Sequence, residues 1–425
     1  MSLYLGIDFG TSGARAAVID QEMRLCVQVS HRFTSVEPHK QATHWQEVLF
    51  SLIQQIPEDI RAQICAIAID GTSSTVLLCD GAGVPLDAPI LYNDLRASSA
   101  LVELQAFFDQ ANLQNAPGQD VVLSATSSLV KLLWWKQQPV YSQARYLLHQ
   151  ADWLAFLLHG QLGISDYHNG LKLGYDVARL EYPSWVETLG VMSLLPQVRS
   201  PGSRVGTIIT AIADHLGLPT DCQICTGTTD SIAAFLASGV TAIGDAVTSL
   251  GSTLVLKLLS KTPVTHATYG IYSHRLGNLW LVGGASNTGG AVLQQFFTSQ
   301  ELLELSPQIS AQLESPLKYY PLTQPGDRFP VNDAALLPCL EPRPANPVDF
   351  LHGLLESMAR IEARGYQLLQ ELGATPLIRV YTAGGGAANS SWTAIRGRQL
   401  QVPVLVSPHT EAAYGTARLA KGGRE

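Results

Sequence analysis

Short apolar runs separated by glycine turns dominate the beginning of the chain and predict a strand-rich start. Leu3, Leu5 and Ile7 alternate with other residues before a turn that contains Gly10 and Gly13. Apolar positions at helical spacing follow later and end before Pro57. The pattern predicts strands at residues 3–9, 13–20, 24–31, 64–69 and 76–79, and a helix at 44–55.

A second cycle of the same kind starts near residue 224. A short apolar run leads through Gly227 and Asp230 into an apolar helix, expected over 232–236. Two predicted strands then flank the turn 251–253, as two strands flank the turn near Gly10. The order strand, strand, strand, helix, strand is typical of a ribonuclease-H-like domain. The repeated hairpin therefore predicts a duplicated fold, with a cleft between the copies.

The other elements follow from periodicity and from proline placement. Prolines crowd residues 306–350, which we expect to form a long irregular surface segment. Further helices are predicted near 96–110, 127–137, 150–159, 347–372, 390–396 and 410–420, and further strands at 269–272, 279–282, 378–381 and 403–406.

Composition limits the classes of function. The chain has 425 residues, of which 46% are hydrophobic and 15% charged, so two domains with sizeable cores are expected. The formal net charge of -8 argues against a nucleic-acid surface, which needs a basic stripe. A bound phosphate must therefore be held by backbone dipoles, a metal ion and a few chosen cations.

Targeting and cysteine signals indicate a cytoplasmic protein without a membrane partner. We find no signal-peptide pattern and no apolar run of membrane-spanning length. The six cysteines lie mostly in strand-like runs and are interpreted as reduced, buried residues. Cys222 and Cys225 have C-x-x-C spacing without a second pair, so zinc or redox chemistry is not favoured. His168, beside Asp166, is interpreted as a structural residue that could also lie near a substrate.

Candidate chemistry gathers at turns rich in glycine and hydroxyl groups, at 10–13, 71–74, 251–253 and 384–386. Glycine allows close approach to an anion, and the turn N–H groups point at it. Asp8 ends an apolar strand beside the first turn, where a carboxylate can hold the water shell of Mg²⁺. The simpler interpretations are that Asp8 caps a turn and that Asp230 caps a helix. Asp70 is interpreted as structural or as a minor acid of the cleft.

These motifs together resemble the FGGY carbohydrate kinases, which belong to the actin/Hsp70/hexokinase-like ATPase superfamily. No Walker or Rossmann glycine pattern competes with this interpretation. The resemblance runs from residue 4 to about 420. It rests on Asp8-Phe9-Gly10-Thr11-Ser12-x-x-Arg15, Gly227-Thr228-Thr229-Asp230-Ser231, Ser249-Leu250-Gly251-Ser252-Thr253, Ala383-Gly384-Gly385-Gly386-x-x-Asn389, and matches at 128–134, 165–169 and 411–417.

The resemblance implies an α/β fold of two ribonuclease-H-like domains of the actin and hexokinase type, with a nucleotide cleft between them. We expect residues 1–223 to form the sugar and phosphate side and residues 224–425 to form the side that carries the catalytic Asp230 and the adenosine site. Asp230 would then begin the second half, and domain closure would carry it onto a sugar held by the first.

Roles for individual residues also follow from the resemblance. Asp230 would accept a proton from a sugar hydroxyl and Asp8 would organise Mg²⁺, because phosphoryl transfer depends on positioning and charge neutralisation. The nucleotide would be ATP. Its phosphates would contact Gly10, Thr11, Ser12 and Arg15 on one side and Gly251, Ser252 and Thr253 on the other, and its adenosine would contact Gly384, Gly385, Gly386, Asn389 and Trp392.

The substrate expected from the resemblance is D-ribulose, contacted by Asp8, Ser73, Asp230 and Ser231. Tyr92 stands where many relatives have Trp, and Asp70-Gly71-Thr72-Ser73 replaces a Gln-x-His-Gly type of turn found in xylulose kinases. Alternatives are a D-xylulose or polyol kinase, an actin- or chaperone-like ATPase switch, and a sugar sensor without catalysis. The expected partner is a small sugar, with no nucleic acid, and the protein would be a monomer or homodimer.

Overall fold

The computed structural model describes residues 2–422 and divides the chain into two compact units. The first unit comprises Met1–Ala237 and Glu411–Glu425, and the second comprises Ser238–Thr410. We had expected the boundary between the two domains to lie between residues 223 and 224, and the observed division differs. The reason is that residues 223–237 pair and pack with the first sheet, and the C-terminal helix returns to the same sheet.

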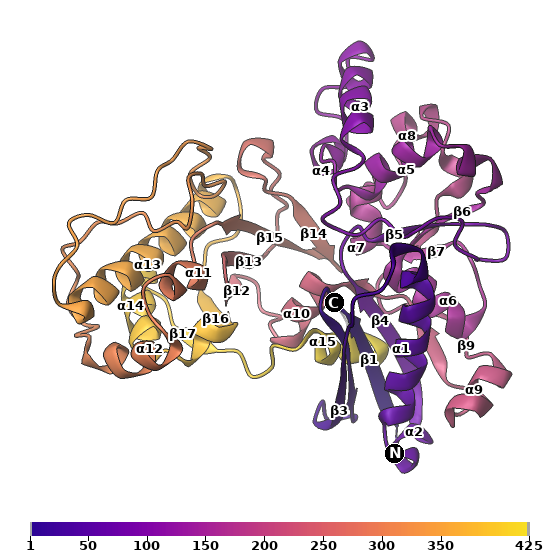
Figure 1. Ribbon diagram of the computed structural model, residues 1–425, viewed down its shortest axis with the longest axis horizontal. Helices are drawn as coiled ribbons and strands as arrows, with labels where there is room; N and C mark the ends of the chain where they lie inside the picture. Colours follow the sequence, from indigo (N-terminus) through magenta and orange to yellow (C-terminus); the bar gives the residue numbers. More distant parts are fainter. Residues whose placement is uncertain (1, 423–425) are drawn as a thin grey trace. The chain divides into compact units, whose positions relative to one another are not determined.

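The central sheet of the first unit has the strand order β3-β2-β1-β4-β10-β9, with β11 also paired to β4 (Figure 1). The first three strands form an antiparallel meander, and β4 then lies parallel to β1. These strands are β1 (Leu3–Phe9), β2 (Gly13–Ile19), β3 (Leu25–Arg32), β4 (Ile64–Gly71), β9 (Arg204–Thr207), β10 (Gln223–Cys225) and β11 (Thr228–Thr229).

Helices cover both faces of this sheet. On one face, α1 (Gln41–Gln55), α6 (Gln150–His159) and α9 (Thr210–Leu216) bury the row that begins with Leu3, Leu5 and Ile7. On the other face, α15 (Ala412–Ala420) and α10 (Asp230–Ala237) pack on small residues. Gly6 is needed there, because a Cβ at this position would lie 2.1 Å from the Ala417 amide nitrogen.

A separate hydrophobic core forms within the first unit between its middle segments. It joins the small sheet of β5 (Val76–Cys79) and β6 (Tyr146–His149) to the helices α3 (Ser98–Gln110) and α5 (Ser128–Lys136). The remaining elements of this unit are α2 (Glu58–Arg61), α4 (Gln119–Val122), α7 (Tyr167–Gly170), α8 (Ser184–Thr188), β7 (Ile164–Asp166) and β8 (Gln197–Arg199).

The second unit repeats the topology of the first sheet. Its order is β14-β15-β13-β12-β16-β17, with β12, β13 and β15 antiparallel and β16 parallel to β12. The predicted duplication is therefore confirmed. The elements are β12 (Asp245–Leu250), β13 (Leu254–Ser260), β14 (Ser273–Leu276), β15 (Leu279–Ser286), β16 (Arg379–Ala383), β17 (Val404–Val406), α11 (Gly290–Gln294), α12 (Ser299–Leu305), α13 (Pro347–Glu371) and α14 (Ser390–Leu400).

Most predicted elements agree with the structure to within a few residues, but the strand expected at 269–272 was wrong. A short 3-10 helix, Ala267–Tyr269, and a turn at Gly270 take its place. Gly270 has a φ of 61°, a conformation that interrupts a strand, so pairing with β15 begins only at Ser273. The proline-rich segment is irregular as expected, with bridges such as Tyr320 to Cys339.

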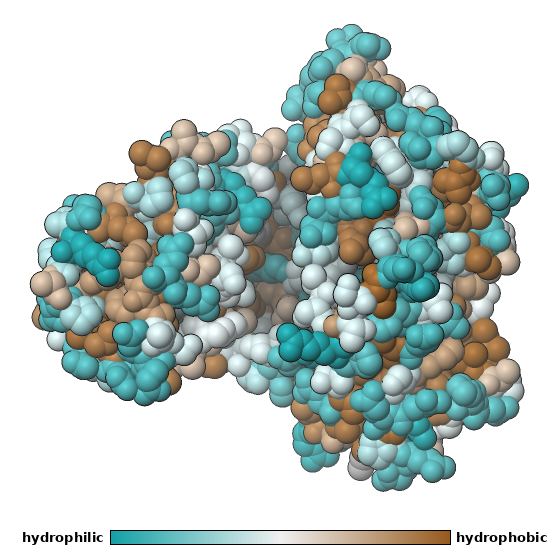
Figure 2. Space-filling model, in the orientation of Figure 1, coloured by the Kyte–Doolittle hydropathy of each residue, from teal (hydrophilic) through white to brown (hydrophobic). Residues whose placement is uncertain are grey.

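The surface is mixed in character. On the face drawn in Figure 2, hydrophobic residues lie in small groups between hydrophilic ones on each unit. Val102 on α3 and Leu303 on α12 are examples of exposed apolar side chains. Within residues 2–422, every helix is too short or too polar to cross a lipid bilayer.

Candidate active site

Three acidic residues, Asp8, Asp70 and Asp230, meet at one edge of the first unit's sheet. Asp8 lies at the end of β1 and Asp70 at the end of β4, directly opposite each other in the parallel register. Thr228 of β11 pairs with Asp70, so the next residues along bring Asp230 to the same edge. The carboxyl ends of parallel strands are where α/β sheets place their ligands, and this edge is the strongest candidate for catalysis.

Asp8 and Asp70 form a buried acid pair. Burial raises the pKa of Asp8 to about 6, and the negative charge of Asp230 adds to the rise. Burial also raises the pKa of Asp70 well above its usual range, with the charge of Asp8 as the next cause. No donor reaches the buried Oδ1 of Asp70 among the described atoms. Of the two acids, Asp70 holds a proton more readily, because its interaction with Asp8 raises the pKa of Asp70 and lowers that of Asp8.

The other oxygen of Asp70 is tied to the C-terminal helix. The Thr416 hydroxyl on α15 lies in hydrogen-bond contact with Asp70 Oδ2, and it also lies 3.1 Å from the Ala412 carbonyl. A hydroxyl has one proton, which Thr416 shares between the Asp70 carboxyl and the Ala412 carbonyl. The helix thus fixes the position of one acid, which in turn contacts the other.

The turn between β1 and β2 lies directly beside the acid pair. Gly10 is half-buried, whereas Thr11 and Ser12 are exposed, so their hydroxyls are free to meet a ligand. Arg15 pairs with Asp8 in the register of the hairpin, and its guanidinium lies 3.9 Å from the Asp8 carboxylate and 3.3 Å from that of Glu411. The predicted phosphate-binding residues of this hairpin are therefore placed together around Asp8.

Asp230 begins α10 and is half-buried. Its Oδ1 accepts a 2.6 Å hydrogen bond from the Ser231 amide, so part of its bonding serves the start of the helix. The sequence led us to expect Asp230 at the beginning of the second domain, but the structure places it in the first unit. Asp230 and Asp8 belong to the same unit: Asp230 follows β11, Asp8 lies at the end of β1, and both of these strands pair with β4.

The predicted sugar-side residue Ser73 lies in the loop that follows β4 and is partly exposed. His168 lies elsewhere in this region: its Nδ1 is 2.7 Å from the Thr228 hydroxyl, and the side chain is buried. Asp166 in turn caps α7 by accepting from the His168 and Asn169 amides. These buried contacts position β11, and they support the structural interpretation of His168.

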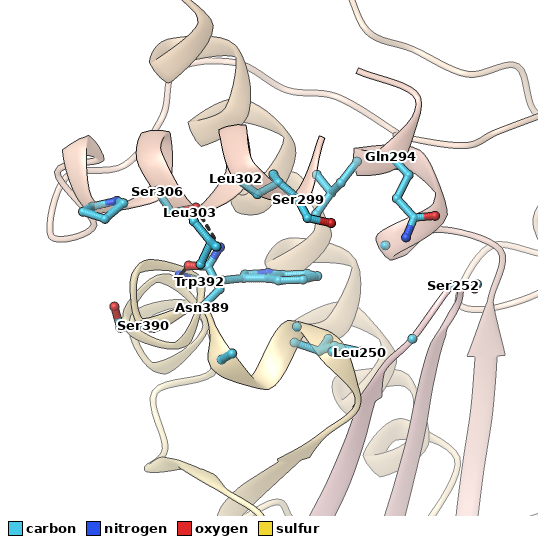
Figure 3. A pocket seen from close by; sticks show the side chains of 17 residues that line it. Leu250, Ser252, Gln294, Ser299, Leu302, Leu303, Ser306, Asn389, Ser390 and Trp392 are labelled. Carbon is cyan, nitrogen blue, oxygen red and sulfur yellow. Dashed lines mark hydrogen bonds between the residues drawn. The ribbon is translucent and has the colours of Figure 1, made fainter. Parts of the chain in front are cut away.

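The second unit contains a separate pocket of about 530 Å³ (Figure 3). Asn389 caps α14 by accepting from the Trp392 amide at 2.9 Å, and its own amide donates to Ser306. Trp392 lies between Leu250 and the residues of α12 that face the pocket. Its indole N–H has no hydrogen-bond partner among the described residues. Of the predicted nucleotide residues, Gly251, Ser252, Gly385, Gly386, Asn389 and Trp392 line this pocket, while Thr253 and Gly384 adjoin it.

One wall of this pocket was missed by sequence reasoning. It is formed by α11, α12 and the residues just after them, which lie within a segment where we predicted no helix. A local signal was present, because Thr298 and Glu301 form a capping box at the start of α12. The missed lining residues are Gly290, Leu293, Gln294, Ser299, Leu302, Leu303, Ser306 and Pro307.

The carboxylates at the ends of β1 and β4 suit a Mg²⁺ ion that keeps most of its water better than a metal ion bound only by protein side chains. Among residues 2–422, no cluster of three or more His, Cys, Asp or Glu side chains is arranged to hold a metal ion. Mg²⁺ keeps most of its water and takes one or two carboxylates plus substrate phosphates. Burial raises the pKa of Asp8 although Arg15 opposes the shift, and a bound cation would favour the ionised carboxylate further.

Comparison with known proteins agrees with the fold. The description "FGGY family of carbohydrate kinases, N-terminal domain" matches residues 3–237, and the corresponding C-terminal domain matches residues 246–421. A xylulose kinase of Staphylococcus epidermidis is 22% identical over 99% of this chain and 87% of its own length.

Solved structures show the same architecture. A Brucella ovis "xyloylose kinase" superposes with a TM-score of 0.85 at 23% identity, over 99% of this chain and 90% of its own. A Plasmodium falciparum glycerol kinase with ADP has a TM-score of 0.85 at 18% identity, over 100% of this chain and 90% of its own. The fold is thus that of two-domain kinases of the actin and hexokinase type. The chain belongs to the FGGY family of carbohydrate kinases.

Proposed function

We propose that the protein transfers the γ-phosphate of ATP to a hydroxyl of a ketopentose, with Mg²⁺ as the metal and D-ribulose as the substrate. The observation that carries this proposal is the convergence of Asp8, Asp70 and Asp230 at the ends of β1, β4 and β11. A hydroxyl nucleophile needs a nearby proton acceptor, and a transferred phosphoryl group needs charge neutralisation. This edge offers groups for both tasks.

In the proposed reaction, the sugar hydroxyl attacks the γ-phosphorus, and the bond to the β–γ bridging oxygen breaks to release ADP. The hydroxyl proton passes to Asp230, which is half-buried and carries its carboxylate at the start of α10. Bound Mg²⁺ would neutralise phosphate charge, and Asp8 would hold it through water. The exposed hydroxyls of Thr11 and Ser12, with Arg15, orient the phosphates.

The adenosine is proposed to bind in the pocket of the second unit. Its 530 Å³ volume falls in the range of small-molecule sites, and one side of it is apolar, with Trp392, Leu250 and Leu302. Gly385 and Gly386 expose backbone where a ligand can approach closely. The Plasmodium glycerol kinase of the same fold was solved with ADP, which supports an adenine nucleotide as the ligand.

The choice of D-ribulose rests on the loop after β4, where Ser73 is partly exposed beside the acids. Asp8, Ser73, Asp230 and Ser231 are proposed to contact the sugar. D-Xylulose is the second candidate, because a xylulose kinase is among the relatives that align along nearly the whole chain. At 22% identity this likeness does not decide the sugar, so the two ketopentoses must be compared directly.

The test is ADP release measured with D-ribulose, D-xylulose, L-ribulose, glycerol and no sugar, each with and without Mg²⁺. We expect the highest kcat/KM with D-ribulose and little ADP release without sugar. A higher kcat/KM with D-xylulose would transfer the assignment to that sugar. ATP hydrolysis that is equally fast in every sugar and in none would overturn the kinase proposal in favour of an ATPase switch.

A further inference from the structure

A lysine is fully buried next to the predicted sugar loop, although lysine is rarely buried without a purpose. Lys131 on α5 has no exposed side-chain surface, and its Nζ donates to two backbone carbonyls, each at 2.7 Å. The acceptors are Ser74 and Leu91, which belong to two different loops. One ammonium group therefore joins two segments close to the point where the Val76–Ile90 bridge also pairs them.

The first of these loops follows β4 and is held in a specific conformation. Ser74 has a φ of 67°, which a non-glycine residue adopts only when its surroundings enforce it. The Thr72 amide and hydroxyl both donate to Gln150 Oε1, and the Thr72 and Thr75 hydroxyls contact each other at 2.5 Å. Between these buried residues, Ser73 is left partly exposed.

The second loop runs antiparallel to the first. Val76 and Ile90 form a bridge with two backbone hydrogen bonds, and the Tyr92 amide donates to the Thr75 hydroxyl at 3.0 Å. This arrangement places Tyr92 across from Ser74, with its side chain 38% exposed. The Lys131 ammonium contacts both loops, at carbonyls one residue away from Ser73 and from Tyr92.

The electrostatics agree with a functional contact rather than a stabilising one. Burial lowers the pKa of Lys131 to about 7, while the nearby Asp94 carboxylate opposes the shift. Burial of a charged group carries a cost that a methionine of similar length would avoid. Residues that break the rules of core packing concentrate at functional sites.

We propose that Lys131 is a positioning residue for the sugar site, acting through the loop that carries Ser73. The proposal rests on the proposed function, since it assumes that Ser73 contacts the sugar. It assigns Lys131 no contact with ATP, because the side chain is fully buried and its Nζ donates to the Ser74 and Leu91 carbonyls.

The experiment compares Lys131→Met with Lys136→Met as a matched control. Lys136 lies on the same helix and donates to one backbone carbonyl, that of Leu189. It is exposed, and this carbonyl belongs to neither of the two loops. We expect Lys131→Met to raise the KM for the preferred sugar at least tenfold and to leave the KM for ATP within twofold of wild type. Lys136→Met should change neither.

A third variant keeps the proposal testable if Lys131→Met fails to fold. Lys131→Arg retains the charge and the donors but is longer, so it should hold the loops at a different spacing and raise the sugar KM severalfold. Circular dichroism and thermal unfolding identify the folded variants. An unchanged sugar KM in every folded Lys131 variant would overturn the inference. So would a fall in kcat with both KM values unchanged.

The two proposals fail in different ways. If the wild-type protein phosphorylates a sugar and Lys131→Met does so with the same sugar KM, only the role of Lys131 is lost. If the wild-type protein phosphorylates none of the sugars, the proposed function fails, and the role of Lys131 fails with it.

Discussion

Asp8 and Asp70 lie opposite each other in the parallel register of β1 and β4, and both carboxyl groups are removed from solvent. Two acids in contact cannot both ionise cheaply, and here burial together with the charge of Asp8 raises the pKa of Asp70. The fold nevertheless keeps the pair, and α15 supplies Thr416 to hold one member. The buried acid pair therefore lowers the stability of the fold at this edge, as is common where a site must bind a cation or phosphate.

We predict that Asp70→Asn stabilises the ligand-free protein at pH 8. A raised pKa favours the folded state below the unfolded pKa, and that contribution is lost as pH rises through the folded pKa. For Asp70 the loss begins near 3.8 and continues well above it, because burial and the charge of Asp8 raise the pKa of this carboxyl. Asparagine at position 70 removes the second acid while keeping a donor toward Asp8. Its free energy of unfolding at pH 8 should exceed that of wild type by ~1–3 kcal/mol.

Denaturant unfolding at pH 5 and pH 8 measures this effect, with Asp109→Asn as the control at an exposed site on α3. The control should change the free energy of unfolding by less than ~0.5 kcal/mol at either pH. An Asp70→Asn protein that is less stable than wild type at pH 8 would show that the ionised pair is favourable, contrary to our account.

We predict that Asp230→Asn lowers kcat by ~10²–10⁴-fold, the range expected for loss of a general base. Asparagine keeps the oxygen that accepts from the Ser231 amide, so the start of α10 should be preserved. Nucleotide binding, measured by calorimetry, should be unchanged. Asp221→Asn, an exposed acid ahead of β10, is the control and should retain wild-type kcat. Wild-type turnover by Asp230→Asn would assign the proton to another acceptor.

The sequence allowed Asp8 and Asp230 to be predicted because each ends a local motif, a strand with a glycine turn or a turn with a helix start. Asp70 was interpreted as structural or as a minor acid of the cleft, and its position opposite Asp8 was not predicted for a physical reason. Its role depends on the register between β1 and β4, and no local pattern reveals which residues of two distant strands lie opposite each other. The contact with Thr416 has the same origin, since the C-terminal helix returns to the first sheet.

The second unit offers a contrasting lesson. Its glycine turns at 251–253 and 384–386 were found from composition, and most of their residues do line one pocket. The opposite wall was missed because Leu302 and Leu303 on α12 stand among polar residues and give no clear apolar stripe. Amphipathic periodicity detects helices that cover a core, whereas α12 has no buried residues and presents its side chains to a cavity.

We predict that Gly385→Ala raises the KM for ATP about fivefold or more and leaves the sugar KM unchanged. A Cβ at Gly385 would meet no atom within 4 Å, so the fold tolerates it, but the methyl group would occupy space at the wall of the pocket. A steric cost of ~1 kcal/mol is enough for a change of this size. Gly397→Ala on α14 is the control, because its Cβ also meets nothing. An unchanged KM for ATP in Gly385→Ala would place the nucleotide elsewhere.

We predict that Gly6→Ala destabilises the first unit by ~4 kcal/mol or more, an effect in the range of severe core substitutions. The added Cβ would lie 2.1 Å from the Ala417 amide nitrogen and 2.2 Å from the Ala413 carbonyl oxygen, so α15 would have to move away from β1. That movement would also withdraw Thr416 from Asp70, so activity per folded molecule should fall. Denaturant unfolding and kcat of the folded fraction measure the two effects. If α15 is held as the structure shows, Gly6→Ala must affect both, whereas a loss of stability with a normal kcat would separate the helix from the acid pair.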